Sequence, residues 1–457
     1  MSNTSDSPDI REAGAGNPTR HPLDWQAAEF YDEAALTREL ERVFDLCHGC
    51  RRCFNLCNSF PTLFDAVDSS PTGELDAVPK QVFWEVVDHC YLCDMCFMTK
   101  CPYVPPHPWN IDFPHLMLRA KASRMRREGT SLRNRTLAAT DAVGKIAGIP
   151  VIVEMVNAIQ RSSAGRALLA STLGVDRTAP VPSFHSRTAR KRLARLGTTT
   201  HPAGRADSVA RATAETRGKV ALFTTCYGNR NEPELAEDLV AVLEHNDIEV
   251  TLIAQERCCG MPRLELGDLA GVAALKEYNI PRLAAAVAAG FDIIAPIPSC
   301  VLMFKQELPL MFPQDPEVAQ VRARIFDPFE YLMLRHRAGL LRTDFQTSLG
   351  KVSYHVPCHL RVQNIGLKTR DLLKLVPDTT VDVIERCSGH NGTYGVKKEF
   401  RAASVKIGRP VMQRVQSAQA QHYSSDCPMA GHQIQSGLPG VDAPEHPLKL
   451  LRLAYGL

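Results

Sequence analysis

Cysteine is the residue whose number and spacing in this sequence point most directly to chemistry. Of 15 cysteines in 457 residues, eight lie between Cys47 and Cys101 and seven between Cys226 and Cys427. A secreted disulfide scaffold is short and dense in cysteine throughout, and this chain is neither. Thiols gathered in two groups of a large chain indicate ligation of a metal or cluster, or redox chemistry.

The first eight cysteines form two runs with two residues between most neighbours. The runs are Cys47, Cys50, Cys53 and Cys57, followed by Cys90, Cys93, Cys96 and Cys101. With this spacing a tight loop wraps three corners of an iron–sulfur cubane while backbone N–H groups point at the sulfides. The last gap of the second run holds four residues where three are usual, so we expect residues 97–100 to bulge.

Each cubane needs a fourth thiolate, which in two-cluster ferredoxin folds comes from the other run. We therefore predict two 4Fe–4S clusters. The first is held by Cys47, Cys50, Cys53 and Cys101, and the second by Cys90, Cys93, Cys96 and Cys57. Zinc also binds four thiolates and stays the alternative, although two paired runs of this kind favour iron–sulfur.

The second group of cysteines occurs as two imperfect copies. The first copy is Cys226, the sequence Cys258-Cys259-Gly260 and Cys300; the second is Cys358, the sequence Cys387-Ser388-Gly389 and Cys427. Cys226 and Cys358 occupy matching places. The two copies therefore indicate an internal duplication of about 130 residues.

Alternating strand and helix patterns surround these cysteines and must position them. Strands are predicted at residues 220–224, 250–253 and 293–297, and again at 351–356, at 381–384 and near Tyr423. Helices are predicted at residues 232–245, 270–289 and 368–375, and from about Ser404. Such alternation predicts two α/β modules with parallel sheets. The cysteines directly follow the strands, at the carboxyl edge where open α/β sheets hold their ligands.

Charge and hydropathy limit the functions of the remaining segments. The net charge is +3, but residues 119–219 carry +14 and the rest of the chain −11. This basic segment could face an anionic surface or an acidic partner, or it could be a solvated helical face. Few aromatic residues lie between the arginines, which argues against nucleic-acid binding. Residues 146–156 are too short to span a bilayer, and we expect them to pack in the core in preference to docking on a membrane or partner helix.

Longer stretches extend the pattern beyond cysteine spacing. They are KCPYVPPHPWNIDFPHLMLRAKA, SLRNRTLAATD, TTCYGN, ERCCGMP, SYHVPCHL and GHNGTYGVKKEF. On these residues the chain, from about residue 40 to residue 457, resembles the iron–sulfur oxidoreductases with CCG domains. That family includes the C component of anaerobic glycerol-3-phosphate dehydrogenase, the heterodisulfide reductase catalytic subunit and the glycolate oxidase iron–sulfur subunit.

The resemblance implies an α+β multidomain protein. Its parts are a flexible tail at residues 1–34, an α-helical ferredoxin domain with the two 4Fe–4S motifs at 35–118, a basic helical connector at 119–217, and CCG modules at 218–345 and 346–457. It also implies that the CCG cysteines bind a further cluster. Those cofactor-binding candidates are Cys226, Cys258, Cys259, Cys300, Cys358, Cys387 and Cys427.

The chain departs from the family pattern in both modules. A complete CCG module ends in CxxC, but here the corresponding segments read Cys300-Val301-Leu302-Met303 and Cys427-Pro428-Met429-Ala430. Ser388 also replaces the second cysteine of the pair, so the first module offers four thiols and the second three. A histidine such as His359, His390 or His432 could complete the second site. The alternative is a structural domain whose leftover cysteines are buried small hydrophobic residues.

By this resemblance we expect an electron-transfer subunit of an oxidoreductase complex. It would relay electrons between a flavoprotein dehydrogenase, or another redox protein, and quinone or another acceptor. The alternatives are a disulfide or substrate reductase with chemistry at a CCG-domain cluster, and a structural zinc protein. The sequence has no GxGxxG motif, so no flavin or NAD is expected on this chain. We expect a cytoplasmic protein, with peripheral association at the inner membrane face if quinone is the acceptor.

Overall fold

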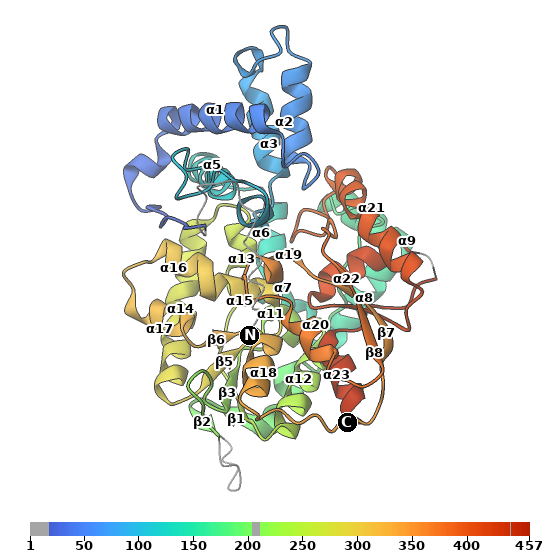
Figure 1. Cartoon of the computed structure of the whole chain (residues 1–457). Coiled ribbons are helices and arrows are strands. Elements are labelled where there is room, and N and C mark those ends of the chain that lie inside the picture. Colours follow the sequence, from blue (N-terminus) through green and yellow to red (C-terminus); the bar gives the residue numbers. More distant parts are fainter. Residues whose placement is uncertain (1–17, 203–210, 439) are drawn as a thin grey trace, which may run out of the picture. The chain divides into compact units, whose positions relative to one another are not determined.

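A computed structural model describes residues 18–202, 211–438 and 440–457 of the chain (Figure 1). The chain divides into two compact units, Met1–Lys121 and Ala122–Leu457. The described part of the first unit is helical, and the second unit combines helices with two sheets of mainly parallel strands. The predicted class, a mixture of helices and parallel sheets, is confirmed.

The first unit packs the apolar faces of short helices around aromatic residues. Its elements are η1 (Ala28–Tyr31), α1 (Glu33–Cys50), α2 (Ser59–Asp68), η2 (Leu75–Ala77), α3 (Lys80–His89), α4 (Met95–Thr99) and the first part of α5 (Phe113–Glu128). The Asp32 side chain caps the N-terminus of α1. Phe44 of α1 packs edge-on against Phe83 of α3, with ring centroids 5.1 Å apart, and lies 6.0 Å from Phe113 of α5. These contacts hold the helices that lead into the two cysteine runs in one core.

Part of the segment predicted as a flexible tail is packed against this unit. Residues 1–17 lie outside the described residues, whereas residues 18–34 include η1 and the start of α1. Leu23 is buried, and Arg20 forms ion pairs with Asp94 and Asp112. Residues 18–34 therefore differ from a flexible tail, because a buried cation and an apolar side chain fix them.

The basic connector forms a series of short helices, as predicted. They are α6 (Leu132–Ala138), α7 (Thr140–Ala147), α8 (Pro150–Arg161), α9 (Ser163–Thr172), α10 (Ala189–Arg192) and η3 (Ala194–Leu196). Two short strands then follow, β1 (Gly197–Thr198) and β2 (His201–Pro202), which the sequence did not predict. Thr198 pairs with Leu252, so the end of the connector joins the first sheet.

The first α/β module follows the predicted order of strands and helices. Its strands are β3 (Lys219–Leu222), β4 (Glu249–Leu252), β5 (Asp292–Ile294) and β6 (Ile325–Phe326). Its helices are α11 (Cys226–Arg230), α12 (Pro233–His245), α13 (Met261–Leu264), α14 (Leu269–Ala288), α15 (Pro298–Leu302), η4 (Met303–Glu307), α16 (Leu308–Met311), α17 (Pro316–Arg322) and α18 (Pro328–Arg337). The sheet order is β2-β1-β4-β3-β5-β6, with β1–β2 as its antiparallel pair.

The second α/β module repeats the same arrangement with three parallel strands. These are β7 (Gly350–His355), β8 (Thr379–Ile384) and β9 (His422–Ser425), in the order β8-β7-β9. The helices are α19 (Cys358–Arg361), α20 (Lys368–Leu373), α21 (Arg401–Ala418), α22 (Pro428–Gln435) and α23 (Pro447–Tyr455). In the first sheet the order β4-β3-β5 is equivalent. The shared order of second, first and third strand supports the predicted duplication.

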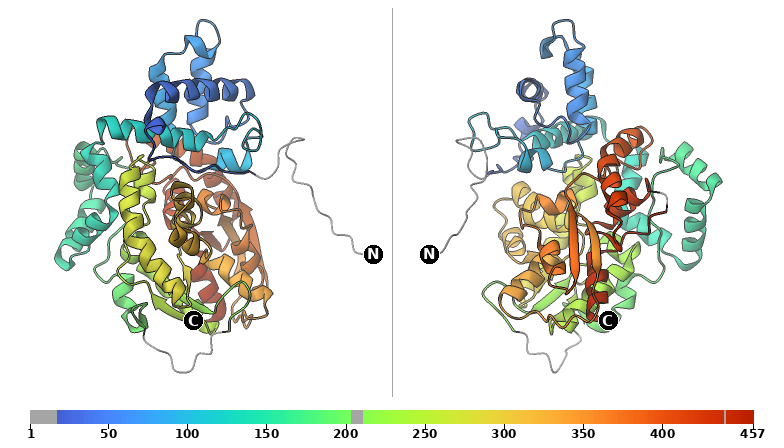
Figure 2. Two further views of the ribbon diagram at one scale, coloured as in Figure 1. Left: turned by 90° about the vertical axis from the view of Figure 1, so that its left-hand side faces the viewer. Right: turned by 45° about the vertical axis from the view of Figure 1, so that its right-hand side comes forward.

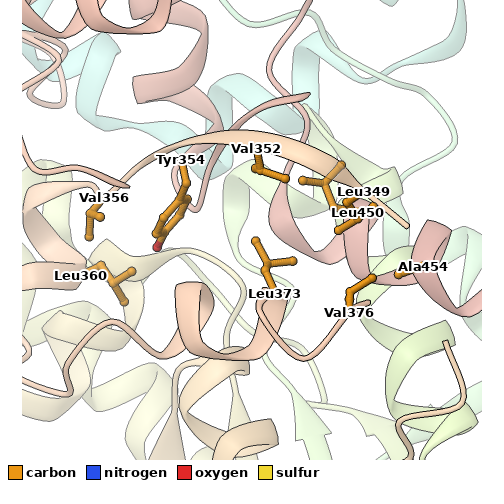
Figure 3. Close-up of a cluster of buried hydrophobic side chains, with 9 residues drawn as sticks. All are labelled: Leu349, Val352, Tyr354, Val356, Leu360, Leu373, Val376, Leu450 and Ala454. Atoms are coloured by element: carbon orange, nitrogen blue, oxygen red, sulfur yellow. The ribbon is translucent and has the colours of Figure 1, made fainter. Parts of the chain in front are cut away.

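Helices cover both faces of the second sheet. On one face, side chains of β7 such as Val352 and Tyr354 point toward Leu373 of α20 and Leu450 of α23 (Figure 3). On the other face, residues of α21 and α22 form a second buried cluster with Ile384 of β8.

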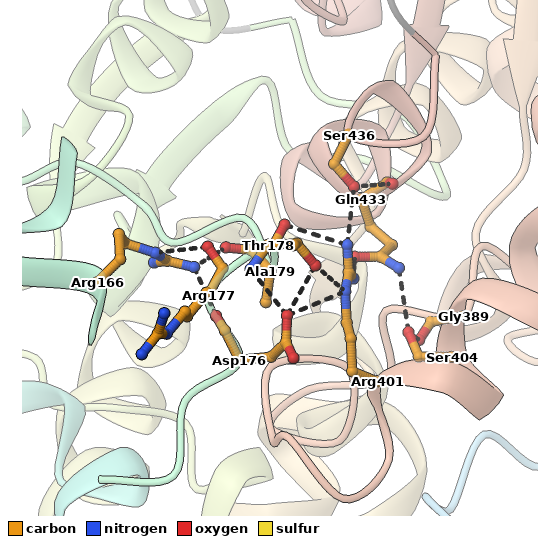
Figure 4. A network of polar contacts seen from close by, with 10 residues as sticks. All are labelled: Arg166, Asp176, Arg177, Thr178, Ala179, Gly389, Arg401, Ser404, Gln433 and Ser436. Carbon is orange, nitrogen blue, oxygen red and sulfur yellow. Dashed lines mark hydrogen bonds and ion pairs between the residues drawn. The ribbon is translucent and has the colours of Figure 1, made fainter. Parts of the chain in front are cut away.

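Arg401 ties the second module to a loop of the connector that Arg166 holds in place, and both arginines are buried (Figure 4). Arg401 of α21 donates to the Gln433 side chain over 2.7 Å and to the Thr178 carbonyl over 3.2 Å. Arg166 of α9 donates to the carbonyls of Asp176 and Arg177. A guanidinium with several fixed donors suits this task, because one side chain satisfies several backbone carbonyls at once.

Helices α7 and α8 carry apolar side chains that are not packed in the core. Val153 is buried as predicted, but Ile146, Val151 and Met155 are exposed, with Val151 84% accessible. The prediction that residues 146–156 pack in the core is therefore wrong for most of their apolar residues. In both views of Figure 2 helix α8 (turquoise) lies toward the edge of the second unit. Within the described ranges, no single helix is long and apolar enough to cross a membrane, and α7 with α8 passes that test only as a pair bent by 106°.

Candidate metal centres

The first cysteine run begins on the last turn of α1. Cys47 and Cys50 lie on that turn, and Arg51 then takes a left-handed conformation with φ of 55°. The Arg51 N–H donates to the Cys47 carbonyl over 2.8 Å and ends the helix. The chain turns sharply at this point and brings Cys53 back toward the thiols of the helix.

The thiols of this run meet one thiol of the second run. Burial raises the pKa of Cys47 well above its ordinary value, and Cys101, Cys53 and Cys50 raise it further. Burial likewise raises the pKa of Cys53 to about 12, with Cys101 as the largest contribution from another thiol. The pKa of Cys101 is raised to about 11 by burial, with Cys50 contributing. These mutual effects arise because the four residues predicted for the first cluster lie close together.

The second run wraps around a short helix. Cys90 ends α3, and Asp94 takes a left-handed conformation with φ of 60° just before α4, which contains Cys96. The Cys101 N–H donates to the Cys96 carbonyl over 2.8 Å. A hydrogen bond across five residues widens this last turn. The extra residue before Cys101 is accommodated by this widened turn at the end of α4, in line with the bulge predicted for residues 97–100.

The thiol of Cys96 lies among members of both runs. Burial raises its pKa well above the ordinary value, and Cys53, Cys90 and Cys57 raise it further. Cys90 and Cys57 belong to the set predicted for the second cluster, whereas Cys53 belongs to the first. Cys96 therefore adjoins thiols of both sets.

Two cations that the sequence reasoning missed fix the loop of the second run. Arg20 donates to both carboxylate oxygens of Asp94, over 2.6 and 2.9 Å, and to both oxygens of Asp112, over 2.8 and 3.0 Å. Lys121 donates to the Cys90 carbonyl. Burial alone would raise the pKa of Asp112, but Arg20 and His115 hold it at about 2. Only a long-range contact reveals Arg20, since nothing in its local sequence marks it.

In the first α/β module, each cysteine follows a strand as predicted. Cys226 begins α11 after β3, Cys258 and Cys259 follow β4, and Cys300 lies on α15 after β5. The Thr224 N–H donates to the Glu256 carboxylate over 3.0 Å, which joins the loop before Cys226 to the loop before Cys258. The sheet therefore brings residues far apart in sequence to one edge.

The four thiols of this module form a continuous chain, in which Cys226 is partly exposed and the other three are buried. Cys258, Cys259 and Cys300 are each at most 4% exposed. Hydrogen bonds with Cys226 and Cys259 lower the pKa of Cys258 well below its ordinary value. The same bonds raise the pKa of Cys226 and Cys259, and Cys259 also bonds to Cys300. Four sulfur donors thus meet at the carboxyl edge of the first sheet.

The connector contributes two further side chains to this edge. Thr140 lies beside the thiols of Cys226 and Cys258 and lowers the pKa of both, while its buried hydroxyl has no hydrogen-bond partner among the described residues. Asp141 accepts a hydrogen bond from the Cys258 N–H over 2.9 Å. Both residues come from α7 and were not predicted as site residues. They end the stretch SLRNRTLAATD, which carried part of the resemblance, so a signal for them was present in the sequence.

The second module gathers fewer thiols. Cys358 begins α19 after β7, Cys387 follows β8, and Cys427 precedes α22 after β9. Burial, with a smaller contribution from Cys358, raises the pKa of Cys427 to about 12. Among the residues that the structure describes, no three His, Cys, Asp or Glu side chains are close enough to hold a single metal ion.

Comparison with known proteins agrees with this architecture. The cysteine-rich domain family designated CCG matches residues 220–305 and 352–435. Anaerobic glycerol-3-phosphate dehydrogenase of Escherichia coli strain K12 has a subunit, designated C, that is 29% identical over 71% of this chain and 77% of its own length. Lactate utilization protein A of an Exiguobacterium species is 30% identical over 39% of this chain and 74% of its own length. The chain belongs to the family of CCG-domain iron–sulfur oxidoreductases.

The two CCG modules face one another within the second unit. The Ser299 Oγ atom lies 2.7 Å from the His359 Nδ1 atom. Ser299 precedes Cys300 in the sequence, and His359 follows Cys358. His432 in turn bonds to Glu232 of the first module over 2.9 Å. Helices α15 and α19 pack together, as do α12 with α23 and α18 with α20. The carboxyl edges of both CCG modules therefore meet at one interface.

Proposed function

We propose that the protein is an iron–sulfur electron-transfer subunit that relays electrons between a redox partner and an acceptor. The observation that carries this proposal is the interleaving of the two cysteine runs. Cys101 of the second run lies among the thiols of the first, and Cys57 of the first run adjoins Cys96 of the second. Exchanged ligands of this kind would keep two clusters within a short distance of each other.

The donor sets fit two 4Fe–4S clusters. Cys47, Cys50, Cys53 and Cys101 would hold one cluster, and Cys90, Cys93, Cys96 and Cys57 the other. When bound, each cluster accepts and returns single electrons. The protein supplies the thiolates and holds their loops rigid through Arg20 and Lys121. Hydrogen bonds and burial around the sulfurs then set the potential of each site.

A further cluster would be held in the first CCG module by Cys226, Cys258, Cys259 and Cys300. These thiols form one chain of contacts, which fits a shared inorganic group. Three of them are at most 4% exposed, so a bulky disulfide substrate has little access. Their burial favours electron relay over direct reduction of a substrate at this module.

The redox partner is proposed to be a flavoprotein dehydrogenase, with quinone as one candidate acceptor. One relative is by name a subunit of a dehydrogenase, which supports a complex in which another subunit oxidises the metabolite. Exposed apolar residues on α7 and α8, in a segment of charge +14, support peripheral association with an anionic membrane surface.

The proposal is tested by the spectra of cysteine variants under anaerobic conditions. Dithionite-reduced wild-type protein should show the broadened EPR signals of two coupled clusters. Cys50→Ser should alter one signal and Cys93→Ser the other. Because Cys57 is assigned to the second cluster, Cys57→Ser should alter the same signal as Cys93→Ser, although it lies in the first run.

Three results would contradict the proposal. Protein that contains zinc and no iron after loading with iron and sulfide would end it. So would N-terminal clusters without magnetic coupling, since relay requires close spacing. A Cys57→Ser variant that alters the signal assigned to Cys50 would overturn the exchange of ligands between the runs.

A further inference from the structure

One loop of the second CCG module holds several buried polar atoms without partners. In the described part of the chain, neither ring nitrogen of His390 has a hydrogen-bond partner, and both are buried. The side-chain nitrogen of Asn391 is buried and unpartnered as well. Buried polar groups in native proteins are nearly always paired, so three such atoms on adjacent residues require an explanation.

This loop lies where the first module carries two of its thiols. Residues 387–391 follow β8 as Cys258-Cys259-Gly260 follow β4. Gly389 has φ of 76°, and a side chain there would lie 2.0 Å from the Ser404 carbonyl, so only glycine fits this turn. Ser388 takes the place of the second cysteine, and its hydroxyl accepts the His390 N–H over 3.3 Å. The loop keeps the backbone of a ligand-binding turn but has lost one sulfur donor.

His390 differs from the two other histidines near the cysteines. The His359 ring bonds to Ser299 and the His432 ring bonds to Glu232. Both of these histidines act electrostatically on His390, so the three rings share one neighbourhood. His359 adjoins Cys358, whose thiol in turn lies near that of Cys427. His390 is therefore the one histidine of this group with both nitrogens uncommitted.

The imidazole of His390 is in the form that binds metals. Burial, with smaller contributions from His359, His432 and Arg401, lowers its pKa to about 4. It is therefore neutral near pH 7 and has a lone pair to donate.

Asn391 lies beside the sulfur of the same loop. Its Oδ1 atom is 3.6 Å from the Cys387 sulfur and accepts from the thiol. An ionised Cys387 would instead need a donor. A half-turn of the Asn391 amide would supply one from the nitrogen that now has no partner.

We propose that His390 is the fourth ligand of an iron–sulfur cluster held by Cys358, Cys387 and Cys427. This inference rests on the proposed function and extends it to the second CCG module. It explains why the loop keeps a neutral, unpartnered imidazole where a cysteine is missing. An imidazole ligand also raises the potential of a cluster above that of an all-thiolate one. The second module would then be the higher-potential end of the relay.

The test compares full-length variants loaded anaerobically with ferrous iron and sulfide. Wild-type protein with 15N-labelled histidine should show nitrogen coupling to a cluster in pulsed EPR. His390→Ala should lose this coupling and about four irons. His390→Cys should keep the iron, lose the coupling and shift the potential of that cluster downward. His359→Ala and His432→Ala are matched controls in the same pocket and should keep the nitrogen coupling.

Other results separate the failure of this inference from that of the proposed function. If Cys387→Ser loses iron but His390→Ala keeps all its iron and its spectrum, the module binds a cluster without His390. If neither variant loses iron, the second module binds no cluster and its loop holds only water. Either result overturns the inference, while the signals that depend on Cys50 and Cys93 would still support the relay.

Discussion

At the scale of single residues, Arg20 shows how a contact remote in sequence supports a metal centre. Its guanidinium binds Asp94 and Asp112 in two bidentate pairs, and its side chain is only 10% exposed. Asp94 stands between Cys93 and Cys96, so the position of that carboxylate sets the shape of the loop. Bidentate pairs of this kind have a fixed geometry. Arg20 is therefore a positioning residue for the second cysteine run.

We expect Arg20→Gln to destabilise the first unit by about 3 kcal/mol, because it leaves the buried carboxylate of Asp94 and the partly buried carboxylate of Asp112 without their cation. All three tryptophans, Trp25, Trp84 and Trp109, belong to this unit. Urea unfolding followed by tryptophan fluorescence therefore reports on the first unit, and absorption near 400 nm reports on the cluster. Both transitions should move to lower urea concentration together.

The matched control is Lys80→Gln, which also removes one positive charge. Lys80 pairs with Glu41 at the surface, where both side chains are at least 40% exposed. Such pairs contribute less than about 1 kcal/mol, so this variant should unfold nearly as wild type. Equal destabilisation by both substitutions would show that Arg20 contributes only its net charge.

At the scale of elements, the sequence predicts the longer strands and misses those of only two residues. Strand β3 and strand β7 match the predicted ranges to within two residues. Strands β1, β2 and β6 have only two residues each, too few for a period to be visible. The cysteine positions at the carboxyl edge could be predicted because each cysteine closely follows a strand that is visible in the sequence. Arg20 could not, because only a tertiary contact brings it to its site, and Thr140 and Asp141 were marked only by the stretch that carried part of the resemblance.

Helix α8 presents an apolar face that the sequence pattern assigned to the core. The periodicity of residues 150–161 is that of an amphipathic helix, but periodicity does not reveal what covers the apolar face. Val153 and Asn157 are buried, while Val151 and Met155 are exposed. We expect this face to bind vesicles of phosphatidylglycerol and phosphatidylethanolamine.

Val151→Glu should weaken vesicle binding about ten-fold, since it removes one valine contact of about 1.5 kcal/mol and adds a repelled charge. Because Val151 is 84% exposed, the fold should be unaffected. Co-sedimentation measures the binding, with Leu453→Glu as the control at another exposed apolar residue of the second unit. An equal effect of both substitutions would indicate non-specific adsorption and contradict a role for α8.

At the scale of the whole molecule, duplication has produced two modules that share a fold and differ at their ligand edges. The strand order is the same, but the first module keeps four thiols and the second three. Their carboxyl edges meet through Ser299 with His359 and through Glu232 with His432. The two edges are therefore in direct contact. The second module also buries neutral histidines, which makes its stability depend on pH.

His446 carries the clearest part of this pH dependence. Its Nε2 atom bonds to the Asp426 carbonyl over 3.1 Å, and its Nδ1 atom accepts the Leu448 N–H at the start of α23. Burial lowers its pKa to about 3. Below about pH 6.5 the unfolded chain takes up a proton on this histidine, whereas the folded chain does not, so the free energy of unfolding falls as the pH falls.

We expect His446→Asn to flatten this dependence, because asparagine can still accept the Leu448 N–H but does not titrate. Between pH 6.5 and pH 5 the wild type should lose about 1.5 kcal/mol more stability than the variant. Hydrogen exchange of α23, compared between the two proteins at each pH, measures the difference, since intrinsic exchange rates and the titration of other groups such as Asp426 cancel. Peptides from β3 and β4 of the first module serve as the internal control and should exchange alike in both proteins. The same pH slope in both would mean that His446 is protonated in the folded protein, contrary to its two hydrogen bonds.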